Sequence, residues 1–409
     1  MTTTQRHRTR TRTALAALAA LATLAQPAPA AARSAPSWAL DRVDQRQLPL
    51  DGAFTPEAAG AGVTVYVIDS GVRSDHAEFA GRLAPGYNAL DPGAPPEDCN
   101  GHGTHVAGIA AGATYGVAPG AVVVPVKVFD CSGAGYGSVV RAGVEWIIEH
   151  HQPGVPAVAN ISVAGGLSNS LNGAIAAAVA DGIVFVAAAG NSNSDACAYS
   201  PGAAPAALTV GSTDSNDARS KFSNYGACVD IFAPGNPVTS AWSTSPTATR
   251  SLSGTSQAAP LVAGAAALLL SRQPELSPAQ VSERLLGDAT LDLVTNPGPS
   301  SPNRLLFVAP PAPPPAPTTT TTTTTLPPAP PADDGANARQ DGVRLAVRLY
   351  RSPNEVAVYS RPFTNVEVRA TPAAGEVLTW VVRTNSVGYT KFSTRRNLAA
   401  YDVSARINP

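Results

Sequence analysis

The fold follows from one stretch of sequence, Ser251-Leu252-Ser253-Gly254-Thr255-Ser256-Gln257-Ala258-Ala259-Pro260 and the run Leu261-Val262-Ala263-Gly264-Ala265-Ala266-Ala267-Leu268-Leu269-Leu270 that continues it. Small residues lead into an almost wholly apolar segment, which ends before Pro274, where proline prevents further helix. Apolar residues on every face predict a helix buried in a large core. The run is too short to cross a bilayer, which needs about 20 apolar residues.

Ser256 lies at the amino end of this predicted helix. The exposed N–H groups and the positive end of the helix dipole would stabilise an oxyanion that forms there. A lone serine before a helix is more often an N-cap, so other parts of the chain must decide between the two interpretations.

Length and composition set the broad class. A chain of 409 residues has room for two or three domains, and 44% hydrophobic with 14% charged residues permits a large core. The formal net charge of −1 argues against a nucleic-acid partner held by bulk electrostatics.

The first 32 residues have the pattern of a secretory signal peptide. Arginines between residues 6 and 12 precede an Ala/Leu run over 14–25 and the small residues Ala30-Ala31-Ala32. The apolar run is short for a membrane anchor. We therefore expect export to the extracellular space, no membrane association after signal removal, and a monomer.

Predicted strands alternate with predicted helices from residue 62 to about 200. The strands are 62–68, 122–128, 155–163 and 183–189, and the helices 138–150 and 170–180. This alternation predicts a parallel sheet with helices on both faces. Asp69 and Asn191 directly follow two of the strands, at the sheet edge where open α/β folds bind ligands.

Four residues form a chemically coherent set: Asp69, His102, Asn191 and Ser256. A serine nucleophile needs a base, the imidazole needs a carboxylate to orient it, and the oxyanion needs donors, here Asn191 and the Ser256 N–H. His102 and His105 as metal ligands are a weaker alternative, because no third ligand is suggested.

The local sequences around these residues are more specific than their order. The motifs Val67-Ile68-Asp69-Ser70-Gly71, Asn100-Gly101-His102-Gly103-Thr104-His105, Ala187-Ala188-Ala189-Gly190-Asn191 and Ser253-Gly254-Thr255-Ser256 resemble those of subtilisin-like serine proteases, peptidase S8. Within that family the chain is most similar to the proteinase K branch and its aqualysin-type secreted members, from Trp38 to Phe307.

The resemblance implies a three-layer α/β fold over 33–308, with a mostly parallel sheet around a central buried helix. It also implies an endopeptidase of broad specificity for proteins and peptides, with Ser256 as nucleophile, His102 as general base, Asp69 orienting it and no catalytic cofactor. By the same resemblance the substrate-binding residues are Ser162, Val163, Ala164, Gly165, Gly133, Gly135, Ala188, Ala189 and Gly190.

Three positions depart from the family pattern. Gln257 stands where methionine usually follows the nucleophile, and Ala164 stands where the family usually has glycine. Tyr136 is displaced by one position in the loop facing Ala164. These changes leave the subsite preference open.

The four cysteines would meet an oxidising environment after export. Spacing alone allows three pairings. The resemblance implies two local disulfides, Cys99 with Cys131 and Cys197 with Cys228, each worth roughly 3 to 4 kcal/mol in the chain-entropy account.

Two structural calcium sites are also implied by the resemblance. One uses the oxygen-rich cluster Asp41, Asp44, Gln45 and Asp51, and the other the carbonyls of Pro205 and Ala207 with the Asp230 carboxylate. Without the resemblance, the first cluster reads as a solvated acidic turn.

The carboxyl-terminal third differs in composition. Residues 309–335 are rich in proline and threonine, including Thr318 to Thr325, and predict an extended linker. Alternating residues over 336–409 predict a small all-β domain, an Ig-like sandwich that binds an unknown surface or ligand. Alternative functions are a catalytically impaired peptide-binding protein and a wall-associated adhesive protein.

Members of the resembled family carry an inhibitory pro-domain between signal and protease, whereas here Trp38 follows Ala32 almost at once. Three explanations are open: the catalytic domain folds unaided, calcium and disulfides lower its folding barrier, or this sequence lacks part of its natural precursor. We expect unaided folding assisted by calcium.

Overall fold

The computed structural model describes residues 33–309 and, between residues 339 and 407, the strand segments only. The chain divides into two compact units, Met1–Pro315 and Ala316–Pro409. The predicted signal peptide and most of the predicted linker lie outside the described residues.

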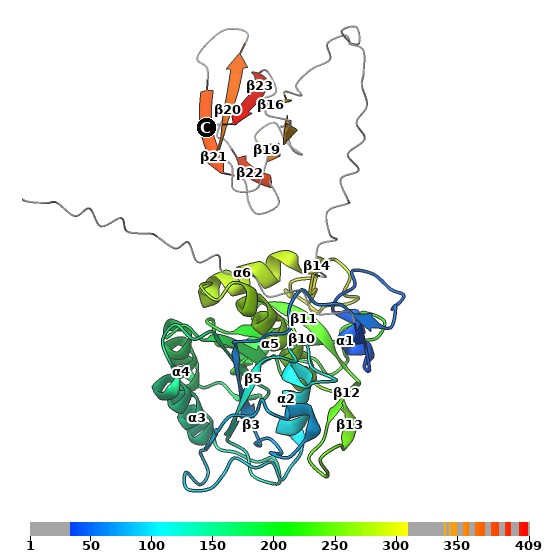
Figure 1. The fold of residues 1–409 in the computed structure, drawn as a ribbon, viewed down its shortest axis with the longest axis vertical. Coiled ribbons are helices and arrows are strands. Elements are labelled where there is room, and N and C mark those ends of the chain that lie inside the picture. Colours follow the sequence, from blue (N-terminus) through cyan, green and yellow to red (C-terminus); the bar gives the residue numbers. More distant parts are fainter. Residues whose placement is uncertain are drawn as a thin grey trace, which may run out of the picture. The chain divides into compact units, whose positions relative to one another are not determined.

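The first unit is built on a nine-stranded sheet (Figure 1). In spatial order the strands are β14 (Thr290–Leu291), β15 (Arg304–Leu305), β11 (Ile231–Asn236), β10 (Leu208–Asp214), β8 (Val184–Ala188), β6 (Ala157–Ile161), β3 (Thr64–Asp69), β5 (Val122–Lys127) and β4 (Tyr87–Asn88). Every neighbouring pair is parallel except β14 with β15. The mostly parallel sheet expected from the sequence is confirmed.

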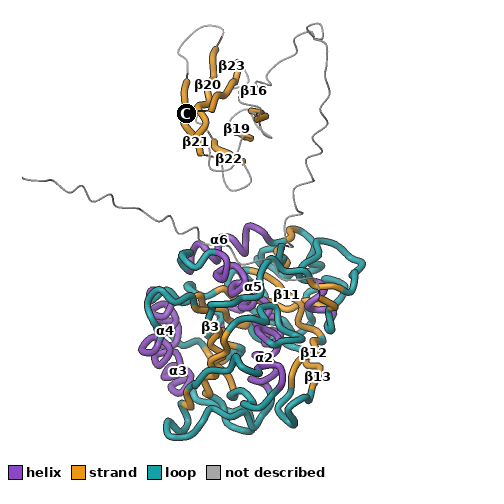
Figure 2. Tube along the Cα trace, in the orientation of Figure 1, coloured by secondary structure: helices purple, strands orange, loops and turns teal. Residues whose placement is uncertain are grey.

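Helices cover both faces of this sheet. In Figure 2, β3 lies between α3 (Gly137–His150) and α4 (Asn169–Ala180) on one side and α2 (His102–Ala111) and α5 (Thr255–Arg272) on the other. Side chains of β3 alternate accordingly: Val65 and Val67 pack in the α5 core, and Ile68 packs in the α3 core. Both faces of β3 are therefore buried, which explains its continuous apolar sequence.

Helix α5 lies at the centre of the larger core. Fourteen of its 18 residues are buried, and it packs on β6, β8, β10 and β11. Alanine and glycine allow the close approach: a Cβ on Gly264 would lie 2.6 Å from Val117 Cβ. The predicted buried helix is thus present, although it begins one residue earlier, at Thr255.

Strand order reverses at β3, which places a crevice at its carboxyl end. The chain runs from β3 to β5 on one side and then to β6 on the other. In open α/β sheets such a switch point is where ligands bind. Asp69 is the last residue of β3.

Smaller elements complete the first unit. They are β1 (Arg33–Ser34) with β2 (Ala53–Phe54), β7 (Gly165–Gly166) with β9 (Tyr199–Ser200), the hairpin β12 (Val238–Ala241) with β13 (Thr249–Leu252), the helices α1 (Trp38–Arg42) and α6 (Pro278–Asp288), and the 3-10 turns η1 (Ala77–Phe79) and η2 (Ala196–Ala198). Helix α6 begins with a capping box, between Ser277 and Gln280.

Two disulfides join loops of the first unit. Cys99 pairs with Cys131, and Cys197 pairs with Cys228, as the family resemblance implied. None of the described helices is long and apolar enough to span a bilayer.

The second unit contains antiparallel strands. One sheet orders β18 (Ala346–Leu349), β19 (Glu355–Tyr359) and β22 (Tyr389–Ser393), a second orders β21 (Leu378–Arg383), β20 (Asn365–Pro372) and β23 (Tyr401–Ile407), and β16 (Arg339–Gln340) pairs with β17 (Val343–Arg344).

Candidate active site

Asp69 lies at the carboxyl end of β3 and is fully buried. Its Oδ1 accepts a hydrogen bond from the Ser70 backbone N–H at 2.7 Å. A buried carboxylate is stable as an anion only when it is paired or hydrogen-bonded. His102 is the second partner.

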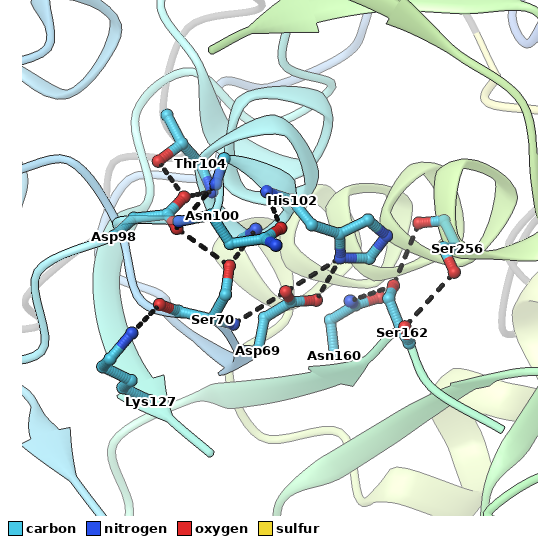
Figure 3. Close-up of polar contacts among 12 residues, drawn as sticks. Asp69, Ser70, Asp98, Asn100, His102, Thr104, Lys127, Asn160, Ser162 and Ser256 are labelled. Atoms are coloured by element: carbon cyan, nitrogen blue, oxygen red, sulfur yellow. Dashed lines mark hydrogen bonds and ion pairs between the residues drawn. The ribbon is translucent and has the colours of Figure 1, made fainter. Parts of the chain in front are cut away.

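His102 is the first residue of α2. Gly101 before it has φ +110°, a left-handed conformation that favours glycine, and a Cβ there would meet the Trp242 ring at 2.5 Å. The turn directs the ring at Asp69, so that His102 Nδ1 lies 2.8 Å from Oδ1 and 3.0 Å from Oδ2 (Figure 3). Burial, the largest single effect, disfavours the charged imidazolium, but the Asp69 charge, the Asp69 hydrogen bond and the Asp98 charge together outweigh burial and raise the pKa of His102.

A buried hydrogen-bond network holds this pair in place (Figure 3). Asp98 accepts from Ser70 Oγ at 2.9 Å and from the backbone N–H groups of Asn100, Gly101 and Thr104 at 2.8 to 3.0 Å. It thereby satisfies N–H groups at the start of α2, which have no partner within the helix. Ser70 Oγ in turn accepts from the Gly103 N–H at 2.9 Å.

Ser256 is the second residue of α5 and faces the His102 ring across a cleft (Figure 3). Its Oγ donates to the Ser162 carbonyl at 3.2 Å, while Ser162 Oγ donates to the Ser256 carbonyl at 3.0 Å. The Ser256 hydroxyl, the predicted nucleophile, is thus hydrogen-bonded to Ser162 rather than to His102 Nε2. In enzymes without substrate, catalytic hydrogen bonds are often long and tighten on binding.

Asn191 presents its amide nitrogen beside Ser256. The Asn191 Oδ1 accepts from the Thr255 N–H and from Thr255 Oγ1, both at 2.9 Å, which leaves Nδ2 as the outward donor. A Cβ placed on Gly254 would lie 3.3 Å from Asn191 Nδ2 and 3.5 Å from the Ser256 nitrogen. The two predicted oxyanion donors therefore flank one space.

The cleft has a volume of about 320 Å³ and is lined by Asp69, Ser70, Asn100, His102, Phe129, Gly133, Ser162, Val163, Ala164 and Ser256. Four of the nine expected substrate-binding residues are among them. Gly135 packs against Phe129 and Gly165 pairs with Ser200 in β7–β9, while Ala188, Ala189 and Gly190 are buried behind the cleft.

Sequence reasoning missed four residues of the site: Ser70, Asp98, Asn100 and Phe129. For three of them the signal was proximity in sequence, since Ser70 follows Asp69 directly and Asp98 and Asn100 stand four and two residues before His102, whereas Phe129 had no such signal. Nothing in the sequence shows that Asp98 accepts bonds from both motifs.

His105 has no catalytic geometry. Its Nε2 contacts the Arg250 carbonyl at 2.9 Å, and burial lowers its pKa to about 4, so the ring is neutral. Among the described residues, no three His, Cys, Asp or Glu side chains are grouped as around a metal ion.

The residues of the first expected calcium site lie together near α1. The Gln45 side-chain nitrogen donates to Asp41 Oδ1 at 2.5 Å and to Asp51 Oδ1 at 2.8 Å. Asp44 Oδ2 accepts from the Thr55 N–H at 2.7 Å, whereas Asp44 Oδ1 is buried without a hydrogen-bond partner. Burial, with repulsion from Asp51 and Asp41, raises the pKa of Asp44 to about 6.

At the second expected calcium site, Asp230 Oδ2 accepts from the Thr209 N–H at 2.8 Å. Burial raises the pKa of Asp230. The Thr209 hydrogen bond and the Arg304 charge offset only part of this burial effect, so the carboxylate favours a cation or a proton.

Comparisons with known proteins agree with this geometry. Residues 60–321 match the family model Peptidase_S8, described as the subtilase family. An extracellular serine proteinase from Thermus sp. (strain Rt41A) is 53% identical over 277 residues, which is 68% of this chain and 67% of the relative. An alkaline serine exoprotease A from Vibrio alginolyticus is 49% identical over 66% of this chain and 50% of its own length.

Among solved structures, the crystal structure of a cold adapted subtilisin-like serine proteinase matches with a TM-score of 0.64 and 47% identity, covering 66% of this chain and 97% of that one. The chain thus spans half to two thirds of the curated relatives and nearly all of this structure.

Proposed function

Because the chain belongs to the subtilase family, we propose that it is a secreted serine endopeptidase that hydrolyses protein substrates through an acyl-enzyme on Ser256. The observation that carries the proposal is the Asp69–His102 pair facing Ser256 in one cleft. The Thermus relative is named an extracellular serine proteinase, which supports export of this chain.

The reaction begins when a peptide carbonyl enters the cleft and Ser256 Oγ turns from the Ser162 carbonyl toward His102 Nε2. Ser256 Oγ bonds to the carbonyl carbon, its proton passes to Nε2, and the carbonyl π electrons move to oxygen. Asp69 stabilises the imidazolium through Nδ1–H, which is the role of a buried carboxylate 2.8 Å away.

The tetrahedral oxyanion accepts hydrogen bonds from Asn191 Nδ2 and from the Ser256 N–H. When it collapses, the C–N bond breaks and Nε2 returns its proton to the leaving amine. Water then repeats the sequence on the ester, with its proton passing first to Nε2 and then to Ser256 Oγ.

Labelling with a serine-directed phosphonate tests this proposal. We expect one label per chain, located on Ser256 by peptide mapping, with loss of proteolysis. The matched control is Ser271→Ala at the other end of α5, which should label fully, whereas Ser256→Ala should not label. An unlabelled wild-type chain would instead favour a catalytically impaired peptide-binding protein.

Structural calcium is part of the proposal. Asp41, Asp44 and Asp51 would supply the hard oxygen ligands that Ca²⁺ prefers if their carboxylates, which are not grouped around one point in the described structure, moved together, and the unpartnered Asp44 Oδ1 supports this. Gln45 would join them by turning its amide oxygen inward. Pro205, Ala207 and Asp230 would hold a second ion. Both ions would be structural and would act on stability alone.

We further propose the domain boundaries 33–308 for the protease, 309–335 for the linker and 336–409 for an Ig-like accessory sandwich. The two three-stranded antiparallel sheets of the second unit support the last assignment. Limited proteolysis of the Ser256→Ala protein should cut first within 309–335.

A further inference from the structure

Gln257, the residue after the nucleophile, is 2% exposed and has an unsatisfied amide. Its Nε2 is buried and has no hydrogen-bond acceptor in the described part of the chain. A buried donor without a partner is destabilising, and an apolar side chain of similar length would fill the same space without that penalty.

The amide lies beside the two oxyanion donors. A Cβ on Gly254 would be 2.8 Å from Gln257 Oε1, 3.3 Å from Asn191 Nδ2 and 3.5 Å from the Ser256 nitrogen. Gln257 Oε1, Asn191 Nδ2 and the Ser256 backbone nitrogen therefore lie on the same side of Gly254, where glycine carries only a hydrogen atom. The Gln257 backbone N–H is already used, since it donates to the Gly254 carbonyl at 3.1 Å.

We propose that Gln257 is a third donor of the oxyanion hole, an inference that rests on the proposed protease function. Rotation of the terminal amide by half a turn exchanges Oε1 and Nε2 in nearly the same volume. It breaks no Nε2 hydrogen bond, because Nε2 has none. The donor then faces the space between Asn191 Nδ2 and the Ser256 N–H, where negative charge develops.

The contribution arises only when the oxygen becomes charged. A neutral ground-state carbonyl is a weaker acceptor than an oxyanion, so the Gln257 bond strengthens in the transition state. The expected signature is a loss in kcat without a matching change in KM.

Gln257→Met tests this inference, because methionine has the same chain length and no donor. The matched control is Gln273→Met, the same substitution at the far end of α5. We expect Gln257→Met to lower kcat by about 10- to 100-fold and to leave KM within about twofold. Removal of one oxyanion donor costs about 10²- to 10³-fold in kcat. We expect a smaller loss here because two other donors, Asn191 Nδ2 and the Ser256 N–H, remain.

A second readout separates a catalytic from a packing role. A peptide trifluoromethyl ketone forms an oxyanion adduct on Ser256, whereas a product peptide binds without one. Gln257→Met should lower the affinity for the ketone by the same factor by which it lowers kcat. The affinity for the product peptide should not change. Gln257→Glu, which keeps the shape, should lose more activity than Gln257→Met, because an ionised carboxylate repels the oxyanion.

An unchanged kcat in Gln257→Met, or equal weakening of ketone and product peptide, overturns the inference while the protease assignment stands. A wild-type chain that neither labels nor cleaves overturns the protease assignment first. In an Asn191→Ala background, Gln257→Met should cause a larger fold loss in kcat. Fewer donors then stabilise the same oxyanion charge, so each remaining donor matters more.

Discussion

Pro260 leaves the Ser256 carbonyl free for Ser162, because proline has no N–H to donate to the residue four positions before it in a helix. That carbonyl instead accepts from Ser162 Oγ at 3.0 Å, and Asn160 Nδ2 donates to the same Oγ at 2.9 Å. The nucleophile is thereby tied to the end of β6 across the cleft.

Pro260→Ala should therefore separate stability from activity. Alanine restores a helical N–H that competes with Ser162 Oγ for the Ser256 carbonyl, so the bond from Ser162 weakens. We expect an unchanged or higher thermal midpoint with kcat/KM lower by about 10-fold, the scale of a modest misplacement of reacting groups. Pro278→Ala is the control, because Pro278 is the first residue of α6 and an N–H at that position has no carbonyl acceptor within the helix. Equal activity in both variants would contradict the relationship.

Removal of the nucleophile and of the first oxyanion donor should differ sharply. Ser256→Ala should lower turnover by about 10⁶-fold, the scale for a lost triad nucleophile. Asn191→Ala should cost only about 10²- to 10³-fold. Initial rates on a peptide amide, corrected for contaminating protease, measure both. Full activity in Ser256→Ala would contradict the proposal that Ser256 is the nucleophile.

Asp69→Asn should lower turnover and shift the acidic limb of the kcat/KM profile against pH. Turnover should fall about 10⁴-fold, as in another Ser-His-Asp enzyme. His102 must be neutral to act as base, so wild-type activity is lost as pH falls through its raised pKa. Without the Asp69 charge this pKa drops and the residual acid limb shifts to lower pH. If the acidic limb of the kcat/KM profile does not shift, Asp69 is not the cause of the raised His102 pKa.

Asp98→Asn should act on His102 in the same direction but more weakly. The Asp98 charge also raises the pKa of His102, after Asp69, and the carboxylate accepts bonds that hold the start of α2. We expect a smaller acid shift of the kcat/KM limb and a lower thermal midpoint. Glu97→Gln is the control, since Glu97 bonds only the exposed Ser74 N–H. The proposed role fails if Asp98→Asn and Glu97→Gln have the same profile.

Calcium should stabilise the protein more at pH 8 than at pH 5. The pKa of Asp44 is raised from 3.8 to about 6, so without metal its contribution to stability is full below pH 3.8 and is lost as pH rises through about 6. An ion at 100 times its Kd adds about 2.7 kcal/mol, or roughly 5 to 10 °C in midpoint.

Chelation of the Ser256→Ala protein measures this effect without autolysis. EDTA should lower the midpoint at pH 8 and have little effect at pH 5, and Asp44→Asn should remove the difference. If EDTA changes nothing at either pH, the calcium proposal is wrong.

Local sequence determined the elements of the catalytic domain and the identity of its chemistry. The continuous apolar run of β3, the small-residue run of α5 and the Ser277–Gln280 cap each act within a few residues, so short windows predict them. The motifs around Asp69, His102 and Ser256 likewise lie in unbroken stretches. Their local sequences, through the family resemblance, were enough to predict the roles.

Only the tertiary structure decided how those stretches meet. The bond from Ser162 Oγ to the Ser256 carbonyl joins residues 94 positions apart, and the bond from Ser70 Oγ to Asp98 joins residues 28 positions apart. The closeness of Gln257 to Asn191 depends on how α5 packs against the end of β8. Such contacts arise from the packing of whole elements, whose relative placement is set by many distant side chains at once. Propensity and periodicity describe a segment and its own faces, and so carry no information about the partner that the folded chain brings to it.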